Sequence, residues 1–271
     1  MEIITNRDQQ ETAQKKVEKL SNGNNSPSPL TAPQIQVCEL TTPHEFRQRM
    51  EDDVRYGLTL PQRWIPSKYR YDEEGSVLFE RIIEQPEYYP AVAENEILAA
   101  QSENIMRLTN PDELIELGSG SSKKTRGLIE AMLVTGSCRR YTPIDISEGV
   151  IREAGEALTR DYDWLQVQGQ VGDYDHDLGR IRRNGRRLFA IFGTTVCNYT
   201  SKAECMEFVK KIKAVMTKGD SLLVGIDLLK DVSVIESCYT DQAGANARFK
   251  LRVLDILNRG SARLSEAGFQ G

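Results

Sequence analysis

Apolar and polar positions alternate along the middle of the chain in a pattern that predicts strands separated by helices. Five short apolar runs have the length of buried strands: residues 114–117, 140–147, 165–174, 187–195 and 221–228. Between them, apolar residues recur every three or four positions, which predicts helices over residues 128–133, 150–158 and 201–215. Strands that alternate with helices form a doubly wound, mostly parallel sheet, so the expected fold class is α/β.

The segments on either side of this region have different patterns. Residues 1–40 are polar and rich in Asn, Ser and Pro, so we expect a disordered tail. Residues 41–110 have helical periodicity and form an expected helical part before the sheet. The sheet core is expected over residues 111–230. A helical C-terminal segment is expected over residues 231–271, with no further strand.

A glycine turn follows the first strand, in the sequence Glu116-Leu-Gly118-Ser-Gly120-Ser-Ser-Lys-Lys-Thr. A strand, a tight turn and a helix in this order present backbone N–H groups and the positive end of the helix dipole to a ligand. A P-loop is excluded because no glycine precedes either lysine, and the dinucleotide fingerprint is excluded because its third glycine would be Lys123. S-adenosylmethionine (SAM) suits the turn best, since it needs no pyrophosphate cradle and its sulfonium cation suits Glu116. An ordinary strand-to-helix turn is the alternative reading.

Further polar residues stand at the ends of the other predicted strands. Asp145 lies at the end of the second strand, at about the spacing that places a carboxylate on ribose hydroxyls in nucleotide-binding folds, and Asp173 ends the third. Gly193 lies at the end of the fourth strand and Asn198 just beyond it. Ligands of open α/β sheets bind beyond the carboxyl ends of the strands, so this combination indicates a nucleoside site.

Composition narrows the class of protein. The chain has 271 residues, a net charge of −5 and a pI near 5.4, which disfavours a nucleic-acid partner. No apolar run reaches the length of a membrane span, so we expect no membrane association. The five cysteines are scattered and the chain has two histidines, so we expect no disulfide framework and no metal site. A reducing, cytoplasmic setting is expected.

Several motifs taken together resemble one family, over about residues 60–258. They are Tyr71-Asp-x-x-Gly75-Ser-x-Leu-Phe79, Pro86-Glu-Tyr88-Tyr-Pro90, the glycine turn with Lys124-Thr-Arg126, Gly193-x-Thr-x-x-Asn198, and Gly225-x-Asp-x-x-Lys-Asp231. In combination they resemble the histidine-specific, SAM-dependent methyltransferases of the ergothioneine pathway, which have a Rossmann-like fold and a helical part that binds the substrate.

The resemblance implies a role for each matching residue. SAM would be held by Gly118 and Lys124 at its methionine end, Asp145 at the ribose, and Asp173 with Tyr174 at the adenine. The amino-acid carboxylate would be held by Asn198 and Tyr239, with Gly193 beside them, while Tyr71 and Tyr88 would surround the amine and the imidazole. Tyr71 and Asn198 are the implied catalytic residues. The expected reaction is attack of a neutral α-amine on the sulfonium methyl, without a metal.

The resemblance leaves the substrate and the activity open. Members of the family continue past the position of Gly271 with further strands, an acid and a serine that read the imidazole, so the chain is expected to be a truncated or alternatively ended form. L-histidine, converted to trimethylhistidine by a monomeric enzyme, is the expected substrate. The alternatives are another amino acid, such as a tryptophan derivative, and a non-catalytic relative that binds SAM or an amino acid.

Overall fold

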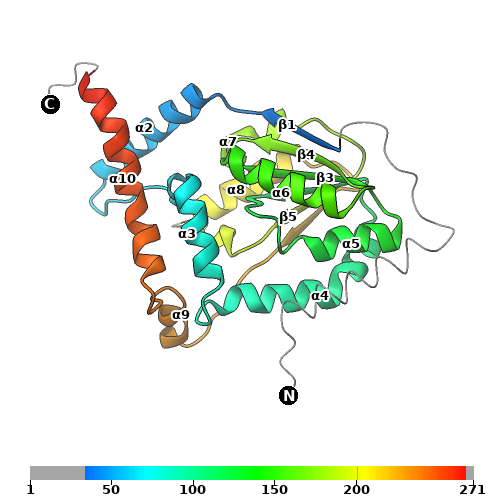
Figure 1. The fold of residues 1–271 in the computed structure, drawn as a ribbon. Helices are drawn as coiled ribbons and strands as arrows, with labels where there is room; N and C mark the ends of the chain where they lie inside the picture. The colour runs from blue at the N-terminus through cyan, green and yellow to red at the C-terminus, as the bar shows by residue number, and fades with distance from the viewer. Residues whose placement is uncertain (1–33, 200, 267–271) are drawn as a thin grey trace.

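The computed structural model describes residues 34–199 and 201–266, and at its centre lies a six-stranded parallel sheet (Figure 1). The strands are β1 (Ile35–Glu39), β2 (Glu113–Leu117), β3 (Arg140–Asp145), β4 (Gln166–Val171), β5 (Arg187–Ile191) and β6 (Ser221–Val224). Their order is β1-β4-β3-β2-β5-β6, and every neighbouring pair is parallel. The predicted doubly wound, Rossmann-like sheet is confirmed, with β6 ending four residues before its predicted end.

Strand β1 corrects one expectation. It lies inside the segment predicted to be a disordered tail through residue 40, and it pairs in parallel with β4, beginning with Ile35 opposite Val167. Ile35 packs on helix α6 (Glu148–Asp161) at Gly155, where an added Cβ would lie 2.4 Å from the Ile35 Cδ1 atom. The strand alternates apolar and polar residues, as an edge strand does. The rest of the predicted tail, residues 1–33, lies outside the described residues.

Helices cover both faces of the sheet because side chains of successive strand residues point to opposite sides. On one face lie α4 (Tyr89–Thr109), α5 (Arg126–Thr135) and α6 (Glu148–Asp161), whose buried residues pack with Leu114 and Leu188. On the other face lie α7 (Tyr174–Asp177), the 3₁₀ turn η2 (Leu178–Arg180) and α8 (Lys202–Val215), which contribute to a second core with Ile115 and Phe189. The sheet is therefore buried on both sides, as a parallel sheet requires.

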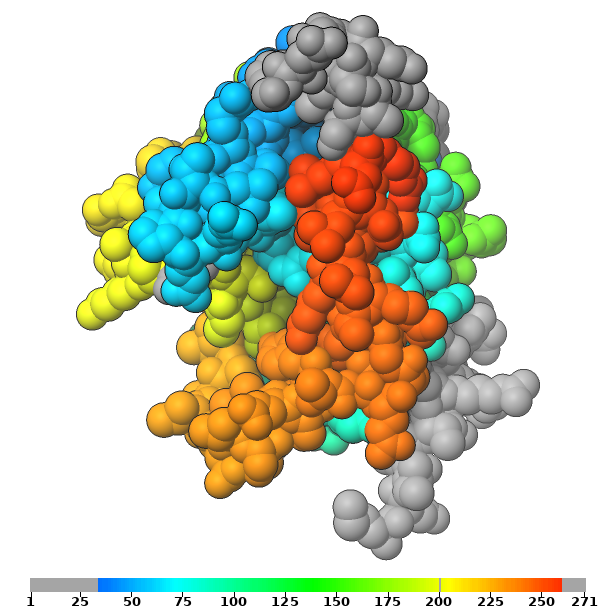
Figure 2. Space-filling view, turned by 90° about the vertical axis from the view of Figure 1, so that its left-hand side faces the viewer, coloured from blue at the N-terminus to red at the C-terminus, as the bar shows by residue number. Residues whose placement is uncertain are grey.

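A third group of helices lies beside the sheet. It comprises α2 (Pro43–Thr59), η1 (Ser67–Arg70), α3 (Glu73–Ile83), α9 (Val232–Cys238) and α10 (Ala245–Glu266), with η3 (Thr195–Asn198) after β5. Figure 2 shows α10, in orange to red, lying across the N-terminal helices in blue to cyan. Arg252 of α10 fixes this contact, because its guanidinium bonds Asp72 at 2.6 Å and Glu74 at 2.7 Å. The N-terminal and C-terminal helices of this group, far apart in the sequence, thus form one unit, which we call the helical unit.

Local signals explain where these helices begin. Thr42 and Glu45 form a reciprocal capping box at the start of α2. Asp72 caps α3 by accepting the Gly75 N–H at 2.9 Å. A Cβ at Gly75 would lie 1.7 Å from the Arg70 carbonyl oxygen, so only glycine fits where η1 passes the start of α3. In the part of the chain described, no helix is both long and apolar enough to cross a membrane.

Candidate functional site

One open cleft, with a volume of about 2410 Å³, is lined by residues from the sheet and from the helical unit. All ten residues singled out as site residues line it: Tyr71, Tyr88, Gly118, Lys124, Asp145, Asp173, Tyr174, Gly193, Asn198 and Tyr239. They come from the ends of four strands and from three segments of the helical unit. The structure therefore brings together residues that are up to 168 positions apart in the sequence.

The glycine turn after β2 departs from expectation in its hydrogen bonds. The N–H groups of Gly118 and Ser119 donate to the Ile144 carbonyl at 2.8 and 3.2 Å, and the Gly120 N–H donates to Asp145 Oδ2 at 3.0 Å. These groups are therefore already bonded within the turn, so the expectation that they point free at a ligand is wrong. What the turn does offer is space, because Gly118 and Gly120 both have positive φ and lack a Cβ.

Asp145 joins two loops at the floor of the cleft. Its Oδ2 accepts from Gly120 and its Oδ1 accepts the Ser147 N–H at 3.1 Å. Burial raises the pKa of Asp145, and the backbone hydrogen bonds of Gly120 and Ser147 oppose that rise. Ser147 occupies the N-cap position of α6, but its side chain makes no capping bond. The carboxylate of Asp145 is thus fixed in orientation by backbone donors.

Glu116 lines the cleft beneath the turn, and its proposed pairing with a sulfonium stays a prediction. Its side chain is buried and accepts hydrogen bonds from the hydroxyls of Thr125, at 2.5 Å, and Tyr141. Burial raises the pKa of Glu116 to about 7, against these two hydrogen bonds, which lower it. The acid therefore anchors the turn to β3 through Tyr141.

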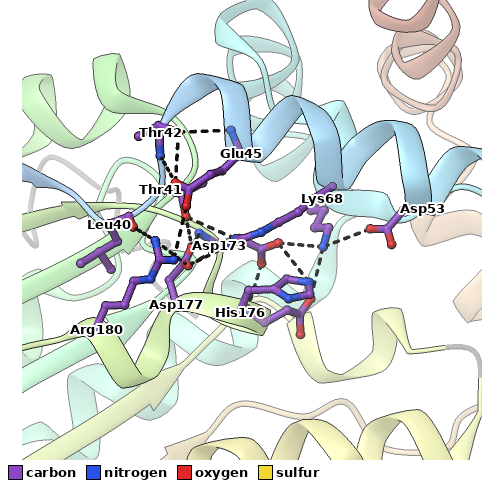
Figure 3. A network of polar contacts seen from close by, with 12 residues as sticks. Leu40, Thr41, Thr42, Glu45, Asp53, Lys68, Asp173, His176, Asp177 and Arg180 are labelled. Carbon is purple, nitrogen blue, oxygen red and sulfur yellow. Dashed lines mark hydrogen bonds and ion pairs between the residues drawn. The ribbon is translucent and has the colours of Figure 1, made fainter.

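At the end of β4, Asp173 is joined to the helical unit by a lysine. Figure 3 shows Lys68 of η1 reaching between Asp53 and Asp173, with Nζ–oxygen distances of 3.5 and 2.7 Å. Asp175 lies 3.9 Å from the same ammonium group. Burial alone would lower the pKa of Lys68, but Asp173 and the two other carboxylates outweigh it and raise that pKa. The lysine is thus a fixed cation at this end of the cleft.

Tyr174 follows Asp173 and places its ring next to the glycine turn. A Cβ added to Gly118 would meet the Tyr174 ring at 3.5 Å, so a side chain there would fill the space between the turn and the ring. The Tyr174 ring also packs on Phe208 of α8, with centroids 5.7 Å apart. Asp145, Gly118 and Tyr174 therefore line the same part of the cleft, at the strand ends where ligands of open α/β sheets bind.

Aromatic side chains line the part of the cleft formed by the helical unit. Tyr71 packs edge-on against Phe79 and Phe249, at centroid distances of 5.4 and 5.0 Å, and Tyr88 packs against Tyr239 at 6.1 Å. Burial raises the pKa of Tyr71 to about 12 and raises those of Tyr88 and Tyr239 as well. These hydroxyls therefore stay protonated near neutral pH and are available as hydrogen-bond donors.

Lys124 and Gly193 face each other across the cleft and share one partner, Glu94 of α4. Lys124 Nζ lies 2.7 Å from Glu94 Oε2, and the Gly193 N–H donates to both carboxylate oxygens, at 3.0 and 3.1 Å. Gly193 has φ of +69°, and a Cβ there would approach Lys124 Nζ to 3.5 Å. Asn198, in η3 just beyond, is exposed. Lys124 and Gly193 thus form one charged cluster with Glu94.

Sequence reasoning missed two of these residues, Lys68 and Glu94. Their partners lie 105 and 30 positions away, and neither residue interrupts a strand or helix pattern in a way that would single it out. The one sequence signal is position. Lys68 lies just before the motif that begins at Tyr71, and Glu94 lies just after the motif that ends at Pro90. Among the described residues no group of three or more His, Cys, Asp or Glu side chains could hold a metal ion.

Comparisons with known proteins identify the family of the chain. The family model of "histidine-specific methyltransferase, SAM-dependent" matches residues 50–270. Histidine N-alpha-methyltransferases of Mycolicibacterium smegmatis and Mycobacterium tuberculosis are each 41% identical to the chain, over 78% and 76% of its length. The matched region spans 66% and 64% of those relatives, about two thirds of their length. An L-tryptophan methyltransferase of Psilocybe serbica is 27% identical, over 76% of this chain and 66% of its own. The chain belongs to the family of histidine-specific, SAM-dependent methyltransferases.

Proposed function

We propose that this protein transfers the methyl group of SAM to the α-amine of a free amino acid, L-histidine. The observation that carries the proposal is the single cleft in which strand-end residues meet the tyrosines of the helical unit. A nucleoside beside the strand ends and an amino acid beside the tyrosines would lie next to each other. Such an arrangement converts a reaction between two molecules into one within a complex, and orientation of this kind contributes about 7–11 kcal/mol.

The cofactor half of the cleft fits SAM in chemistry and in space. Asp145 supplies an acceptor for ribose hydroxyls, and its carboxylate is already oriented by Gly120 and Ser147. Gly118 lines the cleft without a side chain, so a ribose or base can approach the backbone closely there. Lys124 supplies a cation for the carboxylate of the methionine moiety, and Asp173 an acceptor for the adenine amine.

The tyrosine half fits an α-amino acid. Asn198 and Tyr239 supply donors for the substrate carboxylate, and Tyr71 and Tyr88 supply hydroxyls around the amine and the side chain. SAM, when bound, supplies an electrophilic methyl group on a sulfonium. The amine attacks as the neutral base, so its proton leaves to solvent before transfer. The residues of the site orient the amine and exclude water, and none of them forms a covalent bond to the substrate.

Isothermal titration with S-adenosylhomocysteine (SAH), followed by mass spectrometry of SAM and L-histidine incubated with the protein, tests the proposal. We expect binding of SAH and products carrying one to three added methyl groups, with trimethylhistidine, the expected ergothioneine precursor, at the end. Asp145→Ala should weaken SAH binding about 100-fold, because a buried charge-assisted acceptor is lost. Asp163→Ala, at an exposed aspartate outside the cleft, is the matched control. A folded protein that binds SAH but methylates no amino acid would overturn the catalytic proposal.

The aromatic lining supports a second substrate, an indole amino acid. Tyr71, Phe79 and Phe249 form a ring cluster that would pack on an indole as readily as on an imidazole. A panel of free amino acids in the same assay separates the two, since L-histidine and L-tryptophan products differ in mass. Product from L-tryptophan alone would replace L-histidine in the proposal.

We also propose that the protein acts as a monomer in the cytosol. The support is chemical: five free cysteines, of which Cys38 and Cys197 are exposed, suit a reducing compartment. Size-exclusion chromatography with light scattering tests the monomer, and a mass near 30.6 kDa is expected.

A further inference from the structure

Glu94 is the one acid of helix α4 that is held between two loops of the cleft. Its side chain is 14% exposed and that of Lys124 is 17% exposed, so the pair is largely withdrawn from solvent. The carboxylate accepts from Lys124 on one side and from the Gly193 backbone on the other. A third segment closes over it, since a Cβ at Gly225 would lie 2.0 Å from Glu94 Oε1. A side chain at Gly225 would therefore displace the Glu94 carboxylate from this position.

The two partners of Glu94 belong to different halves of the cleft. Lys124 lies in the turn that follows β2, on the side that would receive the methionine end of SAM. Gly193 follows β5 and leads into η3, which ends at Asn198, on the side that would receive the amino acid. Glu94 itself comes from a third element, α4, and therefore bridges two loops that follow different strands.

We propose that Glu94 is the positioning residue that couples the two ligand sites, so that occupation of one tightens the other. The inference rests on the proposed function, because it needs both ligands to bind. When the carboxylate of a ligand binds the Lys124 ammonium, the ion pair between Lys124 and Glu94 Oε2 changes. The same carboxylate bonds the Gly193 N–H, so the change reaches the loop that carries Asn198. Coupling of this kind is reciprocal, and commonly changes affinity about 5–150-fold.

The chemistry of the contacts explains why a carboxylate is required. Lys124 and the Gly193 N–H are both donors, and a carboxylate has only acceptors to offer them. The amide of Glu94→Gln has one acceptor and one donor, so it satisfies one neighbour and opposes the other. Glu94→Asp keeps both acceptors but is one methylene shorter, so it no longer spans the two loops.

The test is the ratio of the L-histidine Kd without SAH to that with saturating SAH, measured by isothermal titration on the full chain. We expect a ratio of about five or more in the native protein and a ratio near one in Glu94→Gln and in Glu94→Asp. Glu96→Gln is the matched control, because Glu96 lies on the same helix, is exposed and is outside the cleft. It should keep the native ratio. Thermal unfolding verifies that each variant is folded. If Glu94→Gln does not fold, the test is made with Glu94→Asp alone.

The outcomes separate the inference from the proposed function. A native protein that binds neither SAH nor L-histidine overturns the proposed function, and the coupling falls with it. A native protein that binds both, with a ratio preserved in a folded Glu94 variant, overturns only the coupling. A ratio near one in the native protein also overturns only the coupling. A ratio near one in both Glu94 variants, with the native ratio kept in Glu96→Gln, supports the coupling. A merely structural change would shift the L-histidine Kd with and without SAH alike and leave the ratio unchanged.

Discussion

A lysine–carboxylate pair holds each end of the cofactor cleft, but the two pairs are assembled from opposite sides. At the proposed adenine end, the lysine, Lys68, comes from the helical unit, and its acid, Asp173, from the sheet. At the proposed methionine end, the acid, Glu94, comes from a helix, and Lys124 from the sheet turn. Both ends therefore depend on contact between the helices and the sheet.

The charge balance of the two pairs differs. Lys68 has three carboxylates within 3.9 Å, so this group of four side chains carries excess negative charge. Lys124 is matched by one carboxylate, with a buried second acid, Glu116, beneath the turn. Loss of the lysine at the methionine end would leave an acid facing the cofactor carboxylate. At the adenine end it would leave acids beside the adenine, which carries no charge, with Asp173 still accepting the Asp175 N–H at 2.9 Å. The methionine end should therefore be the more sensitive.

The largest predicted effect concerns Glu116 and protein stability. The pKa of Glu116 is about 7 in the folded protein, where burial outweighs its hydrogen bonds, and near 4.5 when unfolded. Between these values the folded state holds a proton that the unfolded state has released, so the free energy of unfolding falls as pH rises from about 4.5 to 7. The fall attributable to this residue is about 3 kcal/mol.

Urea denaturation of the native protein and of Glu116→Gln, from pH 4.5 to 8, measures that contribution. The difference in unfolding free energy should move in favour of the variant as pH rises. Glu96→Gln, at an exposed glutamate, is the control and should follow the native curve. A native-minus-variant difference independent of pH would show that Glu116 is ionised throughout.

The second effect is loss of cofactor affinity in Lys124→Met. Removing the ammonium leaves Glu94 bonded to the Gly193 N–H but without its cation, so its charge repels the cofactor carboxylate and SAH should bind about 100-fold more weakly. Titration of the double variant Lys124→Met/Glu94→Gln provides the control, because it removes the repulsion and should recover part of the affinity. Equal affinities in the single and double variants would argue against repulsion by Glu94.

The third effect is the smaller one expected at the adenine end. Lys68→Met should weaken SAH binding about tenfold, because Asp173 keeps its backbone donor while the three acids lose their common cation. Lys68→Arg retains the charge and should stay within a factor of about three of the native affinity. A loss in Lys68→Met as large as that in Lys124→Met would end the distinction between the two ends.

The sequence predicted the part of the cleft that is formed by residues at the strand ends. Apolar runs located five strands, and the residues that follow parallel strands necessarily lie at one edge of the sheet. That rule alone predicts that Gly118, Asp145 and Asp173 lie together, and all three line the cleft. Strand β1 was missed because its apolar positions, Ile35 and Val37, alternate with polar residues after a Pro-rich segment, and two such positions are too few to register.

The contacts that helix residues make with the strand ends could not be predicted in the same way. Lys68 and Glu94 acquire partners only when η1 and α4 pack against the sheet, and nothing in a helical pattern records which exposed-looking charge will face a loop 30 or 105 residues away. The hydrogen bonds of the glycine turn were missed for a related reason. The Gly118 N–H is bonded to a neighbouring strand, through a contact that the local motif does not encode.

The smallest predicted effect comes from a residue that touches neither pair. Tyr71 packs on Phe79 and Phe249 and carries a pKa of about 12, raised by burial, so its hydroxyl is protonated wherever the substrate amine loses its proton, near pH 8 or above. Tyr71→Phe should leave the SAH Kd unchanged and lower kcat about fivefold, the cost of one orienting hydrogen bond. The pH dependence of kcat/KM should rise with the same midpoint in the native protein and the variant, because the group being deprotonated is the substrate amine. A midpoint displaced in Tyr71→Phe would make the tyrosine a participant in proton removal, and a weakened SAH Kd would tie it to the cofactor pairs from which the geometry separates it.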